Sequence, residues 1–449
     1  MEYDLIIIGA GPAGYVAAIR AGQVGLKTAL IEKQHIGGMC LNWGCIPSKA
    51  ILESAKYYNE IKDASEYGID GIDEKKISFN WEKTKKRALN IVKKLTGRVD
   101  YLLTKNDIDV ITGEAKITSN NSVSVSNRNI EAENIIIATG SYPGDIKGNL
   151  EGLNVVNLDK LFDITEIPDN IVIIGHGAVT VEMAQFFRLI DKNVTIIATN
   201  DDLLPKIDNY LSDYILKKVL SDGIKIVKSD LIDTSIGAGE IKVGGDSIKC
   251  DMLLNCSWRN AIIPNSDIEI EKTESGYIST NEFLQTNHPN VFAIGEVNGK
   301  SFLAHVASAQ GLYVVNNIKG VKGSINLKNY PINIYTYPEI AQIGSTEQDL
   351  LDSKIDYKIS EFPLSANGKA LIEGKEEGFI RMISEKKYGE VLGVQIIAHD
   401  ATDLISEAAA FMSVEASIYD IAKTIHAHPT VSEVFMEAGF EAIDKAIHK

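Results

Sequence analysis

Residues 3–14 of the chain read YDLIIIGAGPAG, an apolar run (Tyr3–Ile8) that ends in a glycine turn (Gly9–Gly14). Apolar residues at helical spacing follow in Tyr15–Gln23, and a second apolar run, Thr28–Glu32, ends on an acid. This order of strand, Gly-x-Gly-x-x-Gly turn, helix and acid-tipped strand is that of a dinucleotide-binding unit. Bare glycines admit a pyrophosphate to the helix N-terminus, and the acid accepts hydrogen bonds from a ribose diol. A glycine turn that holds no ligand is the alternative interpretation.

The same order returns once, at Asn170–Ile174, Gly175–Thr180, Val181–Ile190 and Asn193–Ala198. Two such units predict an α/β protein with two Rossmann-like dinucleotide-binding domains. From about Pro331 onward, strands mix with long amphipathic helices, which predicts a separate C-terminal α+β dimerisation domain. The expected segments are a first dinucleotide-binding domain (1–145), a second one (146–267), a central part returning to the first domain (268–330) and the C-terminal interface domain (331–449).

The bulk composition narrows the class of protein. At 449 residues, 45% hydrophobic and 24% charged, the chain resembles a folded globular protein with several domains. No apolar run approaches the roughly 18 residues of a membrane span, and the first residues lead straight into a strand, without room for a targeting segment. A net charge of −16 disfavours nucleic acid and anionic membranes as partners. We therefore expect a cytoplasmic protein.

Two of the four cysteines, Cys40 and Cys45, stand five residues apart. In a regular helix they would be offset by about 7.5 Å along the axis, beyond the usual reach of a disulfide. A bridge between them requires a local distortion, which Gly44 and Pro47 permit. A strained, accessible disulfide is readily reduced, which suits redox catalysis. Two buried thiols or half of a zinc site are the alternatives, but the other two cysteines have no histidine nearby, so we expect no metal.

A histidine segment, His426–Glu433, lies near the C-terminus. Thiol–disulfide exchange needs a proton acceptor near neutral pH, and histidine is the natural one. Glu433 follows His428 by five residues, so its carboxylate could orient the ring as the acid of a triad does. A purely structural histidine is the alternative.

With these motifs the chain resembles the flavin disulfide reductases, and among them the dihydrolipoamide dehydrogenases, over essentially its whole length. The Cys-x₄-Cys-x-Pro-Ser-Lys pattern is specific for that family. Serine at position 48 resembles the dihydrolipoamide dehydrogenases, whereas glutathione reductases more often have lysine there. Mercuric reductases usually add a C-terminal cysteine pair, which this chain lacks. The segments that carry the resemblance are Gly9–Gly14, Cys40–Lys49, Ala138–Ser141, Ala293–Glu296, Leu303–His305 and His428–Glu433.

The resemblance implies a homodimeric FAD enzyme that oxidises a dihydrolipoyl dithiol, either on a carrier protein or as free dihydrolipoamide. Cys40 would be the thiol that exchanges with the substrate, and Cys45 the thiol that meets the flavin. His428, polarised by Glu433 and following the family's cis His-Pro pattern, would be the base and would reach across from the other subunit.

The resemblance also implies the cofactor contacts. Lys49 would lie near the flavin and pair with Glu182. The residues implied for FAD are Gly9, Gly11, Gly14, Glu32, Lys49, Thr139, Gly140 and Glu296, the last standing where the family has aspartate. Those implied for the nicotinamide nucleotide, NAD, are Gly175 and Gly177.

The second nucleotide site departs from the family pattern at three positions. Thr180 replaces the third glycine, Ala198 replaces the acid that contacts the ribose, and Trp258 stands where a glycine usually precedes the arginine. NADP is not supported either, because Asp201 and Asp202 would repel a 2′-phosphate. We expect NAD binding to be weak, displaced or lost, and a re-formed working NAD site is the alternative.

Three functions follow from these patterns. The first is oxidation of a dihydrolipoyl dithiol with NAD as the expected acceptor. The second is that of a flavin disulfide reductase that acts on another dithiol or that uses a redox partner other than a nicotinamide. The third is a non-catalytic flavoprotein that docks on a lipoyl-bearing complex, which the complete Cys, Lys, His and Glu set argues against.

Overall fold

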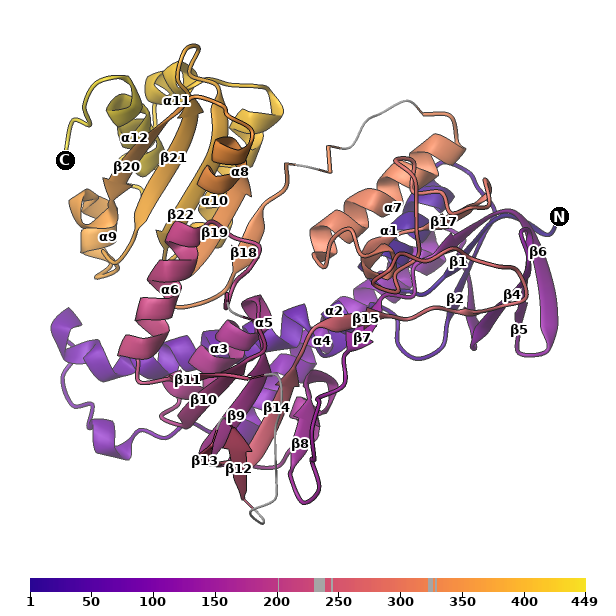
Figure 1. The fold of residues 1–449 in the computed structure, drawn as a ribbon, viewed down its shortest axis with the longest axis horizontal. Coiled ribbons are helices and arrows are strands. Elements are labelled where there is room, and N and C mark those ends of the chain that lie inside the picture. Colours follow the sequence, from indigo (N-terminus) through magenta and orange to yellow (C-terminus); the bar gives the residue numbers. More distant parts are fainter. Residues whose placement is uncertain (201, 230–238, 244, 322–325, 328) are drawn as a thin grey trace. The chain divides into compact units, whose positions relative to one another are not determined.

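The computed structural model describes all residues except 201, 230–238, 244, 322–325 and 328 (Figure 1). The chain forms two compact units, each assembled from segments that are distant in the sequence. The first contains residues 1–170, 231–242 and 246–325, and the second contains 171–230, 243–245 and 326–449. Within the described part of the chain, no helix has the length and apolar character needed to cross a membrane.

A sheet of eight strands forms the centre of the first unit. Its strands are β1 (Tyr3–Ile8), β2 (Thr28–Glu32), β3 (Asp109–Thr112), β4 (Ala115–Ser119), β5 (Ser122–Val125), β6 (Arg128–Ile137), β16 (Asn265–Ser266) and β17 (Val291–Ala293). They follow the order β16-β4-β5-β6-β1-β2-β3, and β17 also pairs with β6. Pairing is parallel from β17 and β6 through β1 and β2 to β3, and antiparallel between β4, β5 and β6.

Parallel pairing explains why the expected strands read as continuous apolar runs. Leu5–Ile7 in β1 are fully buried because both faces of the sheet are covered. One cover is α1 (Pro12–Gln23), which packs against α7 (Ala304–Ile318). The two helices approach so closely that a Cβ atom on Gly311 would lie 2.7 Å from the carbonyl oxygen of Ala13.

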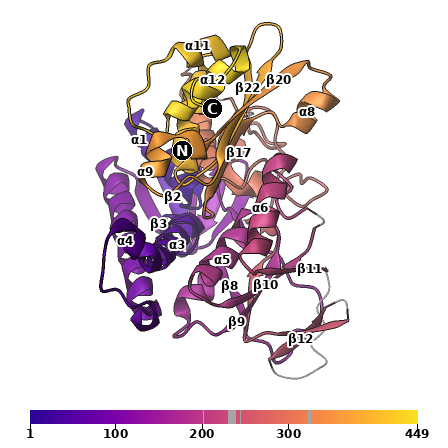
Figure 2. The same ribbon diagram turned by 90° about the vertical axis from the view of Figure 1, so that its left-hand side faces the viewer.

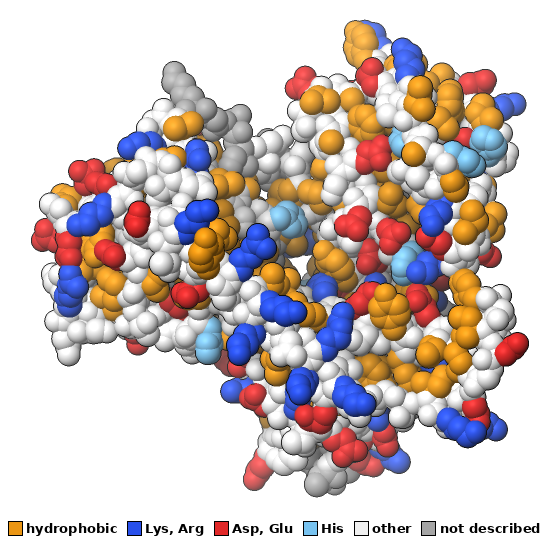
Figure 3. Space-filling view, turned by 180° about the vertical axis from the view of Figure 1, so that it is seen from behind, with side chains coloured by type: hydrophobic (Ala, Val, Ile, Leu, Met, Phe, Trp, Pro, Cys, Tyr) orange, Lys and Arg blue, Asp and Glu red, His pale blue; other side chains and the backbone are white. Residues whose placement is uncertain are grey.

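Three helices after β2 carry the cysteine segment and its support. They are α2 (Gly38–Asn42), α3 (Cys45–Glu60) and α4 (Trp81–Lys105). α4 packs its apolar side against α3 and has eight Lys or Arg but only two acidic residues. Figure 3 shows Lys and Arg side chains gathered over this part of the first unit. The helix is therefore amphipathic, with a solvated basic face.

Short strands connect the later segments of the first unit. β7 (Ser141–Pro143) pairs antiparallel with β15 (Arg259–Ala261), and β8 (Val155–Asn157) pairs parallel with β14 (Met252–Cys256). The first of these pairs places residues that are more than a hundred positions apart in the sequence side by side.

The second unit repeats the order of strand, glycine turn, helix and strand. Its elements are β9 (Asn170–Gly175), α5 (Ala178–Leu189), β10 (Asn193–Ala198), α6 (Asn209–Ser221) and β11 (Lys225–Lys228). The strands lie in the order β11-β10-β9, and β10 and β11 are parallel. This is the second Rossmann-like region that the sequence predicts, because helical crossovers connect parallel strands.

The C-terminal part of the second unit is an antiparallel sheet with helices on it. Its strands are β18 (Ile332–Ile334), β19 (Glu339–Gly344), β20 (Tyr357–Pro363), β21 (Phe379–Glu385) and β22 (Val391–Ala398), in the order β18-β19-β22-β21-β20. Its helices are α8 (Glu347–Asp352), α9 (Gly368–Ile372), α10 (Ala401–Ser413), α11 (Ile418–Lys423) and α12 (Glu433–Ile443). α10 packs on β19 and β22, and α12 packs on β20 and β21 (Figure 1). Figure 2 shows this part from another side, with α11, α12, β20 and β22 labelled.

The predicted fold class is confirmed: an α/β chain with Rossmann-like parallel regions and a C-terminal α+β part. The amphipathic helices expected after about Pro331 include α10 and α11. The division into four segments stays a prediction.

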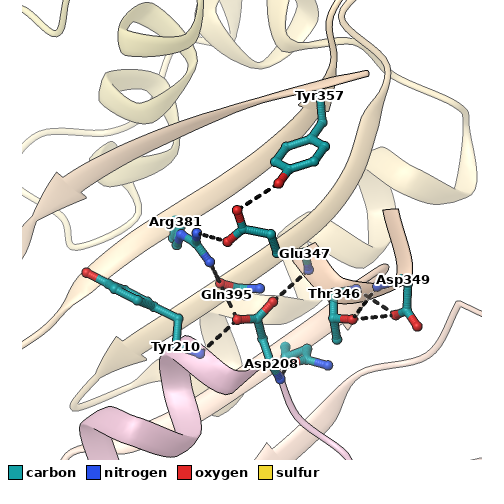
Figure 4. Close-up of polar contacts among 9 residues, drawn as sticks. Asp208, Tyr210, Thr346, Glu347, Asp349, Tyr357, Arg381 and Gln395 are labelled. Atoms are coloured by element: carbon teal, nitrogen blue, oxygen red, sulfur yellow. Dashed lines mark hydrogen bonds and ion pairs between the residues drawn. The ribbon is translucent and has the colours of Figure 1, made fainter. Parts of the chain in front are cut away.

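A buried polar cluster joins the N-terminus of α6 to the C-terminal sheet inside the second unit (Figure 4). Asp208 accepts hydrogen bonds from the backbone nitrogens of Tyr210 (2.9 Å) and Glu347 (2.8 Å). Arg381 in β21 donates to the Glu347 carboxylate at 2.6 Å and lies 3.6 Å from that of Asp208. The hydrogen bond from Arg381 is the main cause that lowers the pKa of Glu347. The Arg381 and Asp208 side chains are only 7% and 3% exposed, so each charge depends on the other.

Replacing Arg381 with methionine is expected to lower the free energy of unfolding by about 3 kcal/mol or more, because it leaves the Asp208 carboxylate buried without its cation. Chemical denaturation measures the loss. Arg128→Met is the matched control, because Arg128 pairs with Glu2 at the exposed surface and should cost less than about 1 kcal/mol. Equal losses in the two variants would show that the cluster does not stabilise the unit.

Candidate active site

The first glycine turn is shaped by two glycines that no other residue could replace. Gly9 has φ +102°, and a Cβ there would lie 2.4 Å from the Ala138 carbonyl oxygen. A Cβ on Gly14 would lie 1.8 Å from the Gly9 carbonyl oxygen. Gly11, by contrast, faces open space apart from Gly38 at 4.0 Å, and no side chain caps the N-terminus of α1 there. The turn therefore leaves an open helix N-terminus that suits a phosphate group.

Glu32 is held beside this turn at the end of β2. Its carboxylate accepts hydrogen bonds from the backbone nitrogens of Ala10 and Gln34, both at 2.8 Å. A carboxylate has about four acceptor positions, so capacity for a ribose diol remains. Glu32 also lines a pocket of about 390 Å³ together with Asn42 and Thr112. The predicted partners Gly9, Gly11, Gly14 and Glu32 therefore surround one site that fits the adenosine and phosphate end of a dinucleotide.

Thr139 and Glu296, two further residues expected to contact the flavin, are held by polar contacts within the first unit. Arg259 donates from Nε to Ser141 Oγ (2.7 Å) and to the Glu296 carboxylate (3.2 Å), and Ser141 also donates to Glu296. The Thr139 hydroxyl donates to the Ile262 carbonyl oxygen at 2.5 Å. Glu296 is thus fixed by Arg259, the residue that follows Trp258.

Trp258 itself is part of an aromatic contact rather than a free indole. Its Nε1 donates to the hydroxyl of Tyr277 at 2.9 Å, and its ring meets Phe302 edge to face at 5.0 Å between centroids. The side chain is partly exposed. Its effect on a nicotinamide stays a prediction.

The two cysteines lie on either side of an interrupted helix. Cys40 is in α2, α3 begins at Cys45, and the intervening Gly44 has φ −105° and ψ −113°. The backbone nitrogens of Trp43 and Gly44 both donate to Met39, at 3.0 and 2.7 Å. Cys40 and Cys45 are not joined by a disulfide in this structure, and their thiols are hydrogen-bonded to one another. The distortion expected from the spacing is therefore present.

The surroundings of the two thiols oppose loss of the Cys40 proton. The hydrogen bond with Cys45 and burial raise the pKa of Cys40, and nearby Glu296 adds to this, whereas the charge of Lys49 lowers it. Tyr15 in α1 is close enough that both cysteines contribute to raising its pKa, after burial. The sequence gives no sign of Tyr15, because its place beside the thiols depends on how α1 and α2 pack.

The histidine expected as base lies in the second unit, before α12. His428 Nδ1 is 2.9 Å from Glu433, and the other carboxylate oxygen accepts a hydrogen bond from the Thr430 nitrogen at 2.8 Å. Burial acts to raise the pKa of Glu433, but these hydrogen bonds and the nearby histidines outweigh it, and the net shift is downward. The His428 side chain is 79% exposed, and the His428–Pro429 bond is cis, as the resemblance implies. A charged acid thus orients a ring whose Nε2 faces outward.

Lys49 and Glu182 belong to different units. Lys49 lies one helical turn after Cys45 in α3. Glu182 in α5 is buried and accepts a hydrogen bond from the Tyr335 nitrogen at 3.0 Å. Their pairing stays a prediction.

The second glycine turn has positive φ at Gly175 (+142°) and Gly177 (+92°), as a tight turn requires. The Gly177 nitrogen donates to the Leu203 carbonyl oxygen at 2.7 Å. One backbone donor of this turn is therefore already used inside the protein.

Thr180 and Ala198, which depart from the family pattern, are both buried, and other polar groups near the turn contact one another. Thr180 is fully buried, and its hydroxyl has no hydrogen-bond partner among the described residues. Ala198 ends β10 in a buried position. Next to it, the Thr199 hydroxyl lies 2.8 Å from Nδ1 of His176, a residue of the glycine turn. Asp202 lies close enough to raise the pKa of His176, although burial lowers it more, and Asp201 lies outside the described residues.

Comparison with known proteins agrees with this geometry. Residues 3–311 match the family described as pyridine nucleotide-disulphide oxidoreductase, and residues 330–439 match its dimerisation domain. The chain belongs to this family. A dihydrolipoyl dehydrogenase of Bacillus subtilis is 36% identical over 100% of this chain and 99% of its own, and a mitochondrial one of Sus scrofa is 35% identical over 100% and 92%.

Solved structures show the same fold. The flavoprotein disulfide reductase RclA of Escherichia coli superposes with a TM-score of 0.85 over 96% of this chain and 98% of its own, at 24% identity. LpdA of Mycobacterium tuberculosis gives a TM-score of 0.87 over 97% and 98%, at 22% identity.

As a pyridine nucleotide-disulphide oxidoreductase, the chain is an oxidoreductase that uses FAD. The open, uncapped N-terminus of α1 and the positioned carboxylate of Glu32 fit this cofactor. The dimerisation domain supports a homodimer. What each predicted residue does stays a proposal.

Replacing Gly14 with alanine is expected to abolish flavin binding, because the new Cβ would clash with the Gly9 carbonyl oxygen and push α1 away from the turn. The flavin absorbance per purified chain should fall from about one equivalent to near zero. Gly368→Ala is the control, since a Cβ there meets nothing within 4 Å. A yellow Gly14→Ala protein with full flavin content would contradict the placement of the cofactor.

Proposed function

We propose that this chain oxidises a dihydrolipoyl dithiol, free or on a carrier protein, through Cys40, Cys45 and FAD. The observation that carries the proposal is the hydrogen-bonded thiol pair at an interrupted helix, with the Lys49 charge beside it. The His428–Glu433 pair adds a base with an exposed ring nitrogen. Full-length relatives named dihydrolipoyl dehydrogenase support the same substrate class.

The chemistry is a thiol–disulfide exchange that starts from the oxidised cysteine pair. His428 takes the proton of one substrate thiol, and the resulting thiolate attacks the Cys40 sulfur. The Cys40–Cys45 bond breaks, Cys45 leaves as a thiolate, and Cys40 is joined to the substrate. The second substrate sulfur then attacks the first, which closes the substrate disulfide, and its proton passes to the Cys40 sulfur, which leaves as a thiol. The substrate loses two electrons and the cysteine pair gains them.

The residues around the pair have distinct roles in this scheme. Lys49 stabilises thiolate character at Cys40, since its charge acts to lower the pKa of that thiol. Glu433 fixes the His428 tautomer by occupying Nδ1, which leaves Nε2 to accept the proton. When bound, FAD supplies a two-electron acceptor for the reduced pair.

The proposal includes a site shared between subunits. His428 is largely exposed in the single chain, and it lies within residues that match the dimerisation domain. We infer that it serves the Cys40–Cys45 pair of the partner protomer. The cytoplasmic location stays a prediction.

For the nicotinamide nucleotide we propose weak or displaced binding of NAD at the second glycine turn. Ala198 offers no carboxylate to a ribose diol, and the Gly177 nitrogen is already hydrogen-bonded to Leu203. The contact between His176 and Thr199 occupies the adjoining polar groups. The opposing interpretation is a re-formed site in which these two side chains receive the ribose.

Replacing Cys45 with serine is expected to abolish flavin reduction by dihydrolipoamide, because the substrate can no longer exchange into a protein disulfide. Anaerobic mixing, followed through the flavin spectrum, measures the rate. Cys250→Ser is the control, since Cys250 is a buried thiol outside the cluster, and it should reduce flavin at the normal rate. A Cys45→Ser protein that is reduced as fast as the parent would favour the non-catalytic flavoprotein.

Replacing Ala198 with glutamate is expected to tighten NADH binding about ten- to a hundredfold, because it restores a charge-assisted hydrogen bond to the ribose. Calorimetric titration of the purified dimer measures the dissociation constant. Asn193→Glu adds the same charge at the other end of β10 and should change nothing. Tight NADH binding by the parent, unchanged in Ala198→Glu, would show that the site has been re-formed.

A further inference from the structure

A second histidine–carboxylate contact lies two residues before the proposed base. His426 is in the segment that connects α11 to α12, and its side chain is only 5% exposed. Its Nε2 lies 2.7 Å from the carboxylate of Glu407 in α10, and its Nδ1 lies 3.0 Å from the carbonyl oxygen of Thr424. This ring therefore bridges a helix and the base-bearing segment, and it is not available to substrate.

Both neighbours of the His426 ring are acceptors. A carbonyl oxygen and a carboxylate have no proton to donate, whereas a neutral imidazole has only one N–H. Satisfying both contacts requires the imidazolium, which donates from both nitrogens. The contact with Glu407 is the main cause that raises the pKa of His426, and it outweighs burial, which acts in the opposite direction.

The charge of His426 also reaches the acid of the catalytic pair. Glu407 of α10 and Glu433 of α12 are the charged groups that act on His426, and His426 is among the groups that lower the pKa of Glu433. The charges therefore alternate in sign: Glu407 is negative, His426 is positive and Glu433 is negative. Glu433 in turn contacts the His428 ring.

We propose that His426 is a positioning residue that stays an imidazolium throughout the reaction. It fastens the segment that bears His428 to α10, and its charge keeps Glu433 ionised while opposing a second positive charge on His428. This inference rests on the proposed function, in which His428 is the base. His426 itself takes no proton from the substrate, because both of its nitrogens are engaged.

The electrostatic role of His426 predicts a shift in pH dependence that a merely structural role would not produce. His426→Gln removes one positive charge and leaves the Glu407 carboxylate, so proton uptake by His428 becomes easier. The acid limb of the pH profile for dihydrolipoamide oxidation should move upward by about half to one pH unit. In His426→Gln/Glu407→Gln the net charge of the pair is again zero, so the limb should return toward its original position.

The control is another histidine–carboxylate contact in the same C-terminal domain. His448 Nδ1 lies 2.8 Å from Glu437, and the His448 ring is mostly exposed. His448→Gln should leave the acid limb in place. If His426→Gln and the double variant lose the same activity with no shift of the limb, His426 is a structural residue and the proposal fails.

A measurement on the unmodified holoenzyme tests the proposal even if the His426 variant does not fold. The ring protons of His426, observed by NMR, should show a pKa above the ordinary histidine value of about 6.5. A His426 ring that loses its proton at or below that value would overturn the proposal. If the parent protein does not oxidise dihydrolipoamide at all, the proposed function fails, whereas the NMR titration still decides the charge of His426.

Discussion

The active-site chemistry of the first unit depends on a helix that is broken between its two cysteines. A continuous helix would carry Cys40 and Cys45 apart along its axis. Instead, the Trp43 and Gly44 nitrogens turn back to a single carbonyl oxygen, and α3 starts anew at Cys45. Glycine relieves crowding at the break, because a Cβ at Gly44 would be 3.1 Å from that same oxygen. The hydrogen bond between the thiols follows from this local geometry.

The broken helix is in turn placed by the first glycine turn. The Gly37 nitrogen donates to the Ala10 carbonyl oxygen at 2.8 Å, and a Cβ on Gly38 would lie 2.6 Å from the Cα of Gly11. The nucleotide turn and the cysteine segment therefore pack backbone against backbone. Glycines on both sides make this approach possible, which explains why a dinucleotide site and a dithiol can share one wall of the unit.

The sequence predicts the parts of the site that are coded locally. The glycine turn, the acid of Glu32 and the distortion between Cys40 and Cys45 follow from spacing alone, and all three are present. Contacts between distant residues are different: Arg259 reaches Glu296, and His426 reaches Glu407, only after strands and helices have packed. Each residue is visible in the sequence, but its partner is not, since no local pattern relates the two.

The two glycine turns show how one local pattern can have two outcomes. At the first, the third glycine leaves no room for a side chain, because the Gly9 carbonyl oxygen occupies that space. At the second, Thr180 is accommodated and fully buried, with a hydroxyl that gains no partner among the described residues. A buried hydroxyl without a hydrogen bond is unfavourable, so the threonine is not explained by stability. The second turn has thus lost the close packing that the first retains, while the strand–helix–strand frame around it is unchanged.

Proton transfer links the thiol pair to the histidine segment. The proposed exchange starts from the oxidised pair, and a disulfide does not accept a proton at neutral pH, so the proton that the substrate must lose has to go elsewhere. An external base is needed, and it must remain neutral before the reaction while its acid partner stays charged. The segment before α12 meets both requirements, because backbone and histidine hydrogen bonds keep Glu433 ionised and the imidazolium of His426 disfavours a second cation beside it. In the proposed reaction the first unit therefore supplies the sulfur that is attacked, and the second supplies the group that accepts the substrate's proton.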